Sequence, residues 1–213
     1  LSGITELSGV SIADGVLRIG AYTTHDTVAT AAVVRDHCPA ISQLAEGIGD
    51  AQVRNRGTIG GSIANNDPAA DYPAAILGLD ATVHTDQRDI AAGDFFTGMF
   101  ETTLAEGEVI TAVSFPAVIA ASYAKFPNPA SRYATVGVMV AQTDAGFRVA
   151  ITGASPCVFR SAAMEEVLNQ GASADALDSV DIDPDTLMGD MHASAEYRAQ
   201  LCRVMAKKAV SGL

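Results

Sequence analysis

The chain has 213 residues, with 25 acidic and 13 basic side chains that give a formal net charge of −12 at pH 7. That charge disfavours nucleic acid as a partner, because proteins that bind phosphate backbones need an excess of Lys and Arg. The hydrophobic content of 48% disfavours a disordered chain, and no apolar run approaches the length of a membrane span.

The first part of the chain predicts a strand followed by short helices. A strand is expected at 17–20, and Thr24 is placed to cap a helix that starts near His25. Pro39 interrupts that helix, and "AISQLAEGIG" predicts a second short helix that ends in glycine.

The segment "VRNRGTIGGSIANNDPAADYPAA" collects most of the unusual local chemistry of the chain. Its glycines, asparagines and Asp-Pro step predict a polar loop with tight turns. A Gly-Gly pair also lets a ligand approach the backbone, and successive N–H groups there would form a concavity for phosphate oxygens. The pattern is neither the dinucleotide fingerprint nor a P-loop, so local residues alone favour an ordinary turn.

After that loop, "DYPAAILGL" predicts a short helix closed by Gly78, and "ATVHT" predicts a strand. In "EVITAVSFP" the alternation of side chains predicts a half-buried strand that Pro116 ends. Two apolar strands flank "TDAG" and predict a β-hairpin.

The last part of the chain predicts helices. "FRSAAMEEVLNQG" predicts a helix that stops at its glycine, and an Asp-rich connector follows. "SAEYRAQLCRVMAKKAV" predicts a final amphipathic helix with Ser194 as its N-cap, and its expected core residues are Tyr197, Leu201, Val204 and Met205.

The irregular stretch "KFPNPAS" lies in the region that divides the chain. We therefore expect two α+β units, residues 1–117 and residues 118–213. The three cysteines, Cys38, Cys157 and Cys202, are far apart and form no Cys-x-x-Cys pair, which disfavours a zinc or iron–sulfur site. Free thiols in the reducing cytoplasm are the expected state of these residues, and the scattered histidines predict no metal site.

Several segments of this chain, in order, resemble one family. "RNRGTIGGSIANNDPAADYPAAI" resembles the FAD-binding signature of the flavin subunit of molybdenum hydroxylases, the medium chain of enzymes related to aerobic carbon monoxide dehydrogenase and xanthine dehydrogenase. "LRIGAYTTHDTVA", "DFFTGMFETTLAEGEVITAVSFP", "YAKFPNPASRYATVGVMVA" and "GDMHASAEYRAQLCRVMAKKAV" resemble further segments of that family. The resemblance covers nearly the whole chain.

The resemblance implies a FAD-binding subdomain of the vanillyl-alcohol oxidase type, followed by a smaller C-terminal α+β domain with an antiparallel sheet. The residues that it assigns to the cofactor are Thr58, Gly60, Gly61, Ser62, Ala64, Asn65, Asp71, Ile110, Lys125 and Tyr133. It implies no catalytic residue and no metal ligand in this chain.

Individual roles also follow from the resemblance. Asp71 would bind sugar or ribityl hydroxyls, and Ile110 would pack against the cofactor. Lys125 would lie near the pyrimidine end of the flavin, where an ammonium stabilises the negative charge of the reduced ring. Tyr133 would lie near the isoalloxazine.

Each polar or aromatic assignment has an ordinary alternative. Asp71 could cap the helix that follows it, Lys125 could be an exposed strand lysine, and Tyr133 could be a strand aromatic in the core.

In the resembled family a further glycine-rich loop, in a small subdomain, precedes the region where this chain starts, at Leu1. We expect the 213 residues alone to bind FAD weakly or not at all, which flavin absorbance at about 450 nm would test.

The resemblance implies an electron-transfer subunit that takes electrons from iron–sulfur clusters and gives them to an external acceptor. Its partners would be a molybdopterin-containing large subunit and an iron–sulfur small subunit, in a dimer of heterotrimers. Two alternatives stay open: a stand-alone flavin reductase or oxidase of the same fold, and a flavin-free scaffold domain. The sequence identifies neither the substrate nor the acceptor.

Overall fold

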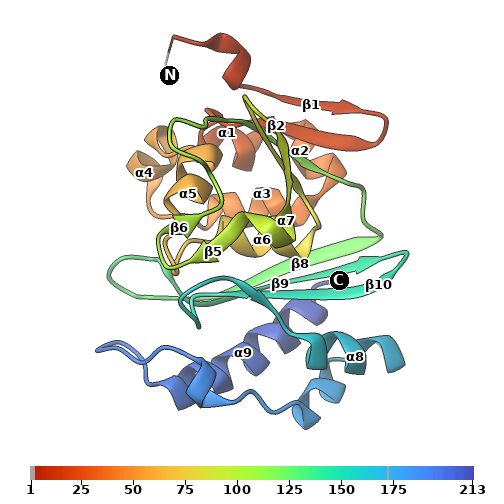
Figure 1. Cartoon of the computed structure of the whole chain (residues 1–213). Coiled ribbons are helices and arrows are strands. Elements are labelled where there is room, and N and C mark those ends of the chain that lie inside the picture. Colours follow the sequence, from red (N-terminus) through yellow and green to blue (C-terminus); the bar gives the residue numbers. More distant parts are fainter. Residues whose placement is uncertain (1–2, 172) are drawn as a thin grey trace.

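The computed structural model describes residues 3–171 and 173–213. Figure 1 shows the chain as stacked layers, in which a group of short helices lies between two β-sheets and two further helices cover the outer face of the second sheet. In the part of the chain that the structure describes, every pair of hydrogen-bonded strands is antiparallel. The predicted α+β class with antiparallel sheets is confirmed.

The layer of short helices begins at residue 25. Its members are α1 (His25–Thr30), α2 (Ala32–His37), α3 (Pro39–Glu46), α4 (Ala51–Arg56), α5 (Ile59–Asn65) and α6 (Tyr72–Gly78). Thr24 caps α1 by accepting a hydrogen bond from the Thr27 amide, as predicted. Pro39 occupies the first turn of α3, where its missing N–H costs nothing, and Gly47 ends that helix.

The first sheet has the strand order β1-β2-β7-β3-β4. Its strands are β1 (Val10–Ala13), β2 (Val16–Gly20), β7 (Ile110–Phe115), β3 (Thr82–Thr85) and β4 (Asp89–Ala91). The prediction of a half-buried strand at 110–115 is wrong in one respect, because β7 is central and buries Ile110 and Ala112 as well as Val113 and Phe115. β2 and β3 flank β7 on its two sides, and their side chains shield the small residues of its second face.

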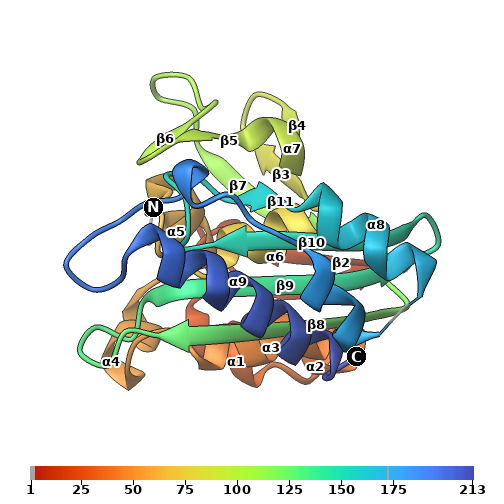
Figure 2. The ribbon, with the colours of Figure 1, turned by 90° about the horizontal axis from the view of Figure 1, so that it is seen from below.

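Shorter elements connect these strands. Thr5–Leu7 forms a 3₁₀ turn, α7 (Ala92–Phe95) follows β4, and β5 (Phe96–Gly98) pairs with β6 (Glu101–Thr102) in a small separate hairpin. Figure 2 shows this hairpin projecting beyond the two main sheets. Among the described residues, no helix is both long and apolar enough to cross a membrane.

The second sheet is built around the predicted hairpin. Its strands are β8 (Ala120–Pro127), β9 (Ala134–Thr143), β10 (Gly146–Thr152) and β11 (Phe159–Arg160), in the order β11-β10-β9-β8. β9 and β10 pair from Thr143–Gly146 at the turn to Gly137–Thr152 at the far end. Because the turn is short, it fixes the register along the whole hairpin.

Helices cover both faces of this second sheet. Figure 2 shows α8 (Ala162–Gln170) and α9 (Ala195–Val210) running across its outer face. The connector between them contains 3₁₀ turns at Ala174–Ser179 and Pro184–Thr186. The opposite face packs against the helix layer, so that Met139, Ala141 and Ala150 join the hydrophobic cluster of the first unit. The division into residues 1–117 and 118–213 therefore stays a prediction.

Two helix details differ from the sequence prediction. Gly78 is the last residue of α6 and does not close it, because Leu79 occupies the C-cap position. Ser194 caps α9 as predicted, and Leu201 and Met205 are buried. Tyr197 and Val204 are instead 45% and 41% exposed, since only one side of α9 contacts the sheet.

A buried carboxylate ties the first sheet to the loop that precedes β7. Glu108 accepts hydrogen bonds from Arg88 Nε at 3.0 Å, from Thr85 Oγ1 at 2.8 Å and from the Ala105 amide at 2.8 Å. These donors stabilise the charged form and lower the pKa of Glu108 to about 2, with the hydrogen bond from Arg88 as the largest cause.

We predict that Glu108 adds stability above about pH 4.5 that is lost as the pH falls toward 2, because its pKa is lower in the folded than in the unfolded chain. Urea unfolding of the wild-type and Glu108→Gln proteins at several pH values measures this. The difference in stability between them should shrink steadily as the pH falls. A difference that is constant from neutral to acidic pH would contradict the assignment.

Candidate functional site

The segment predicted as a polar loop is for the most part helical. Thr58 caps α5, and its Oγ1 accepts a hydrogen bond from the Gly61 amide at 3.1 Å. Asn66 ends the helix in the left-handed conformation, with a φ of 43°. A Thr N-cap and an Asn C-cap together favour a short helix over a loop, even with two glycines in its first turn.

The predicted concavity of free backbone N–H groups is therefore absent from this first turn. The amide of Ile59 donates to Thr23 O, that of Gly60 to Ala21 O, and that of Ser62 to Thr58 O. A ligand could approach the backbone of α5 closely because the two glycines have no side chains. Its hydrogen bonds would come from neighbouring side chains.

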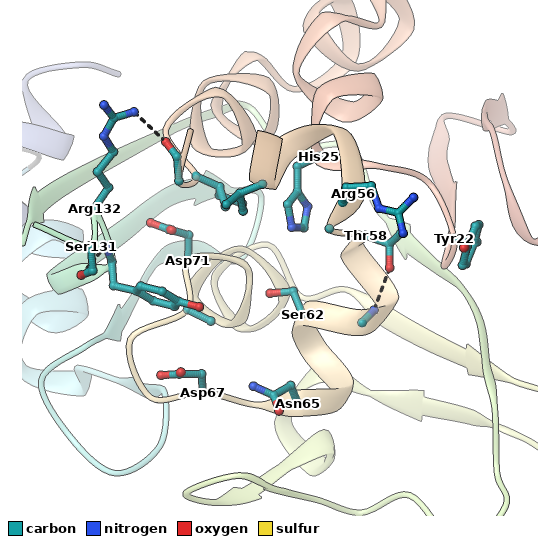
Figure 3. A pocket seen from close by; sticks show the side chains of 17 residues that line it. Tyr22, His25, Arg56, Thr58, Ser62, Asn65, Asp67, Asp71, Ser131 and Arg132 are labelled. Atoms are coloured by element: carbon teal, nitrogen blue, oxygen red, sulfur yellow. Dashed lines mark hydrogen bonds between the residues drawn. The ribbon is translucent and has the colours of Figure 1, made fainter. Parts of the chain in front are cut away.

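Two cavities meet at this helix start. The first has a volume of about 530 Å³ and is lined by residues of α1, α4, α5 and the loop 131–133, so we call it the polar cavity. Figure 3 shows Thr58, Ser62 and Asn65 along one of its walls, with Asp71 and Ser131 across from them. The second, of about 330 Å³, is lined by Leu7, Ala21, Leu104 and Val109, among others, and we call it the apolar cavity. Thr58 and Gly61 line both.

The structure brings the predicted cofactor residues together, with one exception. Those that line the polar cavity are Thr58, Gly61, Ser62, Asn65, Asp71 and Tyr133. Those that line the apolar cavity, besides Thr58 and Gly61, are Gly60, Ala64 and Ile110. The exception is Lys125, which is not among the lining residues of either cavity and instead contacts Asp71.

Asp71 is buried at the base of the polar cavity, with a relative exposure of 4%. The alternative role of helix cap is wrong, because its side chain makes no capping hydrogen bond to α6. Tyr123 Oη donates to Asp71 Oδ1 at 2.6 Å, and Lys125 Nζ lies 2.9 Å from the same oxygen. Burial raises the pKa of Asp71, while the charge of Lys125 and the hydrogen bond from Tyr123 oppose that rise.

The ordinary alternatives for the other two residues are also wrong. The Lys125 side chain is only 10% exposed, so it is not a surface lysine. Tyr133 is 50% exposed and lines the polar cavity, so it is not a core aromatic. Its hydroxyl makes no hydrogen bond to the part of the chain that the structure describes, which leaves the ring free to contact a ligand.

Several residues that line the polar cavity are not among those predicted from the sequence, and three of them have notable side chains: Tyr22, His25 and Arg132. His25 is buried next to Tyr72, with ring centroids 5.3 Å apart, and burial lowers the pKa of His25 to about 4. Arg132 has a φ of 62° and donates to Gly49 O at 3.1 Å. These residues come from separate elements and share no local pattern, so only the tertiary fold identifies them.

The chain is similar to known proteins both in sequence and in structure. Residues 1–118 match the family described as the FAD-binding domain in molybdopterin dehydrogenase. The chain is 31% identical over 222 residues to the nicotine 6-hydroxylase medium subunit of Paenarthrobacter nicotinovorans, a match that covers 98% of this chain and 77% of the relative.

Solved structures of carbon monoxide dehydrogenases are also similar. A chain of the enzyme from Hydrogenophaga pseudoflava aligns with a TM-score of 0.88 and 30% identity, and a chain of the enzyme from Oligotropha carboxidovorans aligns with a TM-score of 0.90 and 27% identity. Each alignment covers 99% of this chain and 79% of the other. The chain belongs to the family of FAD-binding subunits of molybdenum hydroxylases, which are parts of oxidoreductases.

Proposed function

We propose that this chain forms one wall of the FAD site in an electron-transfer subunit, which takes electrons from iron–sulfur clusters of a partner and passes them to an external acceptor. The observation that carries the proposal is the meeting of the polar and apolar cavities at Gly61, where nine of the ten residues that resemble the family signature converge. Cavities of a few hundred Å³ with mixed polar and apolar walls are typical of cofactor sites.

The residues present fit FAD by their chemistry. The side chains of Arg56, Ser62 and Asn65 line the polar cavity and make no hydrogen bond to the described residues, so their donors are available to diphosphate and ribityl oxygens. Ile110 and Ala64 offer an apolar surface in the adjoining cavity. A bound flavin would supply the redox-active ring that takes up and releases the electrons.

Each wall residue has a defined task in this proposal. Thr58 Oγ1 already accepts from the Gly61 amide, so its hydroxyl proton is free to donate to the cofactor. The Asp71 carboxylate would accept hydrogen bonds from cofactor hydroxyls. Tyr133 would contact the cofactor from the polar cavity and limit the access of water, and Ile110 would contact it from the apolar cavity.

Partners are part of the proposal. The relatives are named as medium subunits or medium chains, which is the naming of multi-subunit enzymes. The three cysteines of this chain are free and lie far apart in the sequence, so they do not form the ligand set of an iron–sulfur cluster. We propose a molybdopterin-containing large subunit and an iron–sulfur small subunit as partners, in a dimer of heterotrimers in the cytoplasm.

Anaerobic rapid mixing of the purified complex with its reducing substrate tests this function. We expect stoichiometric FAD whose absorbance at about 450 nm is lost only when the molybdenum and iron–sulfur subunits are present. A flavin that a nicotinamide reduces in the isolated full-length subunit would instead indicate a stand-alone reductase. A complex that assembles without any flavin would indicate a scaffold.

A further inference from the structure

We propose that the first sheet carries a second site, at which Ser114 acts as the nucleophile in the hydrolysis of esters of small carboxylic acids. Ser114, His84 and Asp89 form a continuous chain of hydrogen bonds there. None of the three residues lines the polar or the apolar cavity, so this inference does not depend on the proposed FAD site.

The three side chains come from three neighbouring strands, β7, β3 and β4. His84 lies opposite Asp89 in one strand pair and opposite Ala112 in the other. Ser114 is two residues beyond Ala112, which makes it a diagonal neighbour within reach of the imidazole. The pairing of β3 with β7 shifts register between His84 and Thr85, and irregularities of this kind re-aim side chains.

The Ser114 and His84 side chains lie on the face of the sheet that is turned away from the layer of short helices. Val113 and Phe115, on either side of Ser114, belong to the hydrophobic core and are fully buried. Val83, next to His84, is fully buried in the same cluster. Because successive side chains of a strand point to opposite faces, Ser114 and His84 point to the outer face.

The hydrogen bonds fix the direction in which a proton can move. His84 Nδ1 lies 2.6 Å from Asp89 Oδ1, and His84 Nε2 lies 2.7 Å from Ser114 Oγ. A carboxylate only accepts hydrogen bonds, so Nδ1 carries the imidazole proton and Nε2 accepts from the Ser114 hydroxyl. This order of nucleophile, base and orienting carboxylate is the arrangement that activates a serine.

A small cavity of about 220 Å³, which we call the outer cavity, adjoins this chain. Its lining includes Arg18 and Ala112, which lie directly opposite Ser114 and His84 in the strand pairs. Directly opposed residues share one face of a sheet, with their Cβ atoms about 5 Å apart. Pockets for drug-sized ligands start at about 300 Å³, so the outer cavity suits a small acyl group.

The charges around the outer cavity fit an uncharged ester. Arg18 is exposed, and its guanidinium makes no hydrogen bond or ion pair with the residues that the structure describes. It is therefore available to stabilise the negative charge that develops on an ester oxygen when Ser114 attacks. Glu6 lines the same cavity and disfavours an acyl group that carries a carboxylate of its own.

The reaction needs only the ester and water. Ser114 Oγ bonds to the acyl carbon, the ester C–O bond breaks, and the hydroxyl proton passes to His84 Nε2 and then to the departing alcohol. Water next attacks the acyl-serine and gives a proton to the same nitrogen, which returns it to Ser114 as the carboxylic acid leaves. Asp89 does not touch the ester and is a positioning residue for His84.

Covalent labelling of the full-length protein, in its complex with its partners, tests this inference. The probe is an alkyl fluorophosphonate, and mass spectrometry of the peptides identifies the labelled residue and its subunit. Hydrolysis of p-nitrophenyl acetate measures turnover. The variants are Ser114→Ala, His84→Gln, Asp89→Asn and Asp89→Glu. Ser211→Ala is the control, because the Ser211 hydroxyl donates to Lys207 O and has no histidine partner.

We expect the probe to label Ser114, and Ser114→Ala to lose both this label and the ester turnover. His84→Gln should slow the labelling by roughly 10²–10⁴-fold, the usual contribution of a general base. Asp89→Asn should slow it less, and Asp89→Glu should restore part of the rate, which a merely structural role of this side chain would not produce. Ser211→Ala should react like the wild type.

A wild-type complex in which the probe leaves Ser114 unlabelled would overturn the inference, whether or not the variants assemble. Labelling of His84→Gln at the wild-type rate would overturn it too, because the serine would then react without its base. Ester turnover that Ser114→Ala leaves unchanged would show that Ser114 does not catalyse the hydrolysis.

Discussion

Replacement of Gly61 by alanine in the full-length subunit is expected to weaken FAD binding about tenfold or more while the fold keeps its stability. A Cβ at this position meets only Thr58 Oγ1, at 3.0 Å, and otherwise faces the point where the polar and apolar cavities join. Alanine also favours a helix over glycine by up to about 1 kcal/mol, which offsets the tight contact.

The measurement for Gly61→Ala combines FAD titration of the deflavinated complex with thermal unfolding. Gly93→Ala is the matched control, because Gly93 also lies in a short helix and a Cβ there meets nothing within 4 Å. An unchanged Kd for Gly61→Ala together with an unchanged melting temperature would contradict the placement of the cofactor against α5.

Replacement of the neighbouring Gly60 by alanine should have the opposite profile and destabilise the protein itself. A Cβ on Gly60 would lie 2.6 Å from Ala21 Cβ and 2.7 Å from Ala21 O, which are parts of a backbone segment that cannot move freely. The Gly60 amide also donates to that carbonyl at 2.8 Å. Overpacking of this kind costs about 1–3 kcal/mol.

For a chain of this size the melting temperature of Gly60→Ala should fall by roughly 2–12 °C. Thermal unfolding without FAD is the measurement, so that lost binding does not contribute. We assign helix packing to Gly60 and ligand approach to Gly61. A melting temperature of Gly60→Ala equal to that of Gly61→Ala would contradict this assignment.

The helices with clear end signals were predictable from the sequence. Thr24 and Ser194 carry local hydrogen-bond chemistry that does not depend on the rest of the chain, and both caps are confirmed. Exposure was less predictable, because it depends on what packs against an element. β7 is buried on both faces by its position in the sheet, and Tyr197 is exposed because α9 covers the sheet with one side only.

The candidate site also contains residues that the sequence predicts and residues that only the tertiary fold identifies. Gly61, Ser62 and Asn65 lie within the single helix α5. They therefore belong to one short sequence motif, which the family resemblance identifies. His25 and Arg132 reach the polar cavity from segments far apart in the chain, so no local pattern marks them. The ion pair between Lys125 and Asp71 joins a residue on β8 to a residue at the start of α6. These two residues are far apart in the sequence, so only the folded chain reveals the pair.

Hydrogen exchange of the complex, compared with and without FAD, tests the central claim most directly. The account predicts that added FAD slows amide exchange in residues 57–66 and 131–133, which form the two sides of the polar cavity. Residues of α8, on the outer face of the second sheet, should be unaffected. Stoichiometric FAD binding with no change in residues 57–66 and 131–133 would contradict the account.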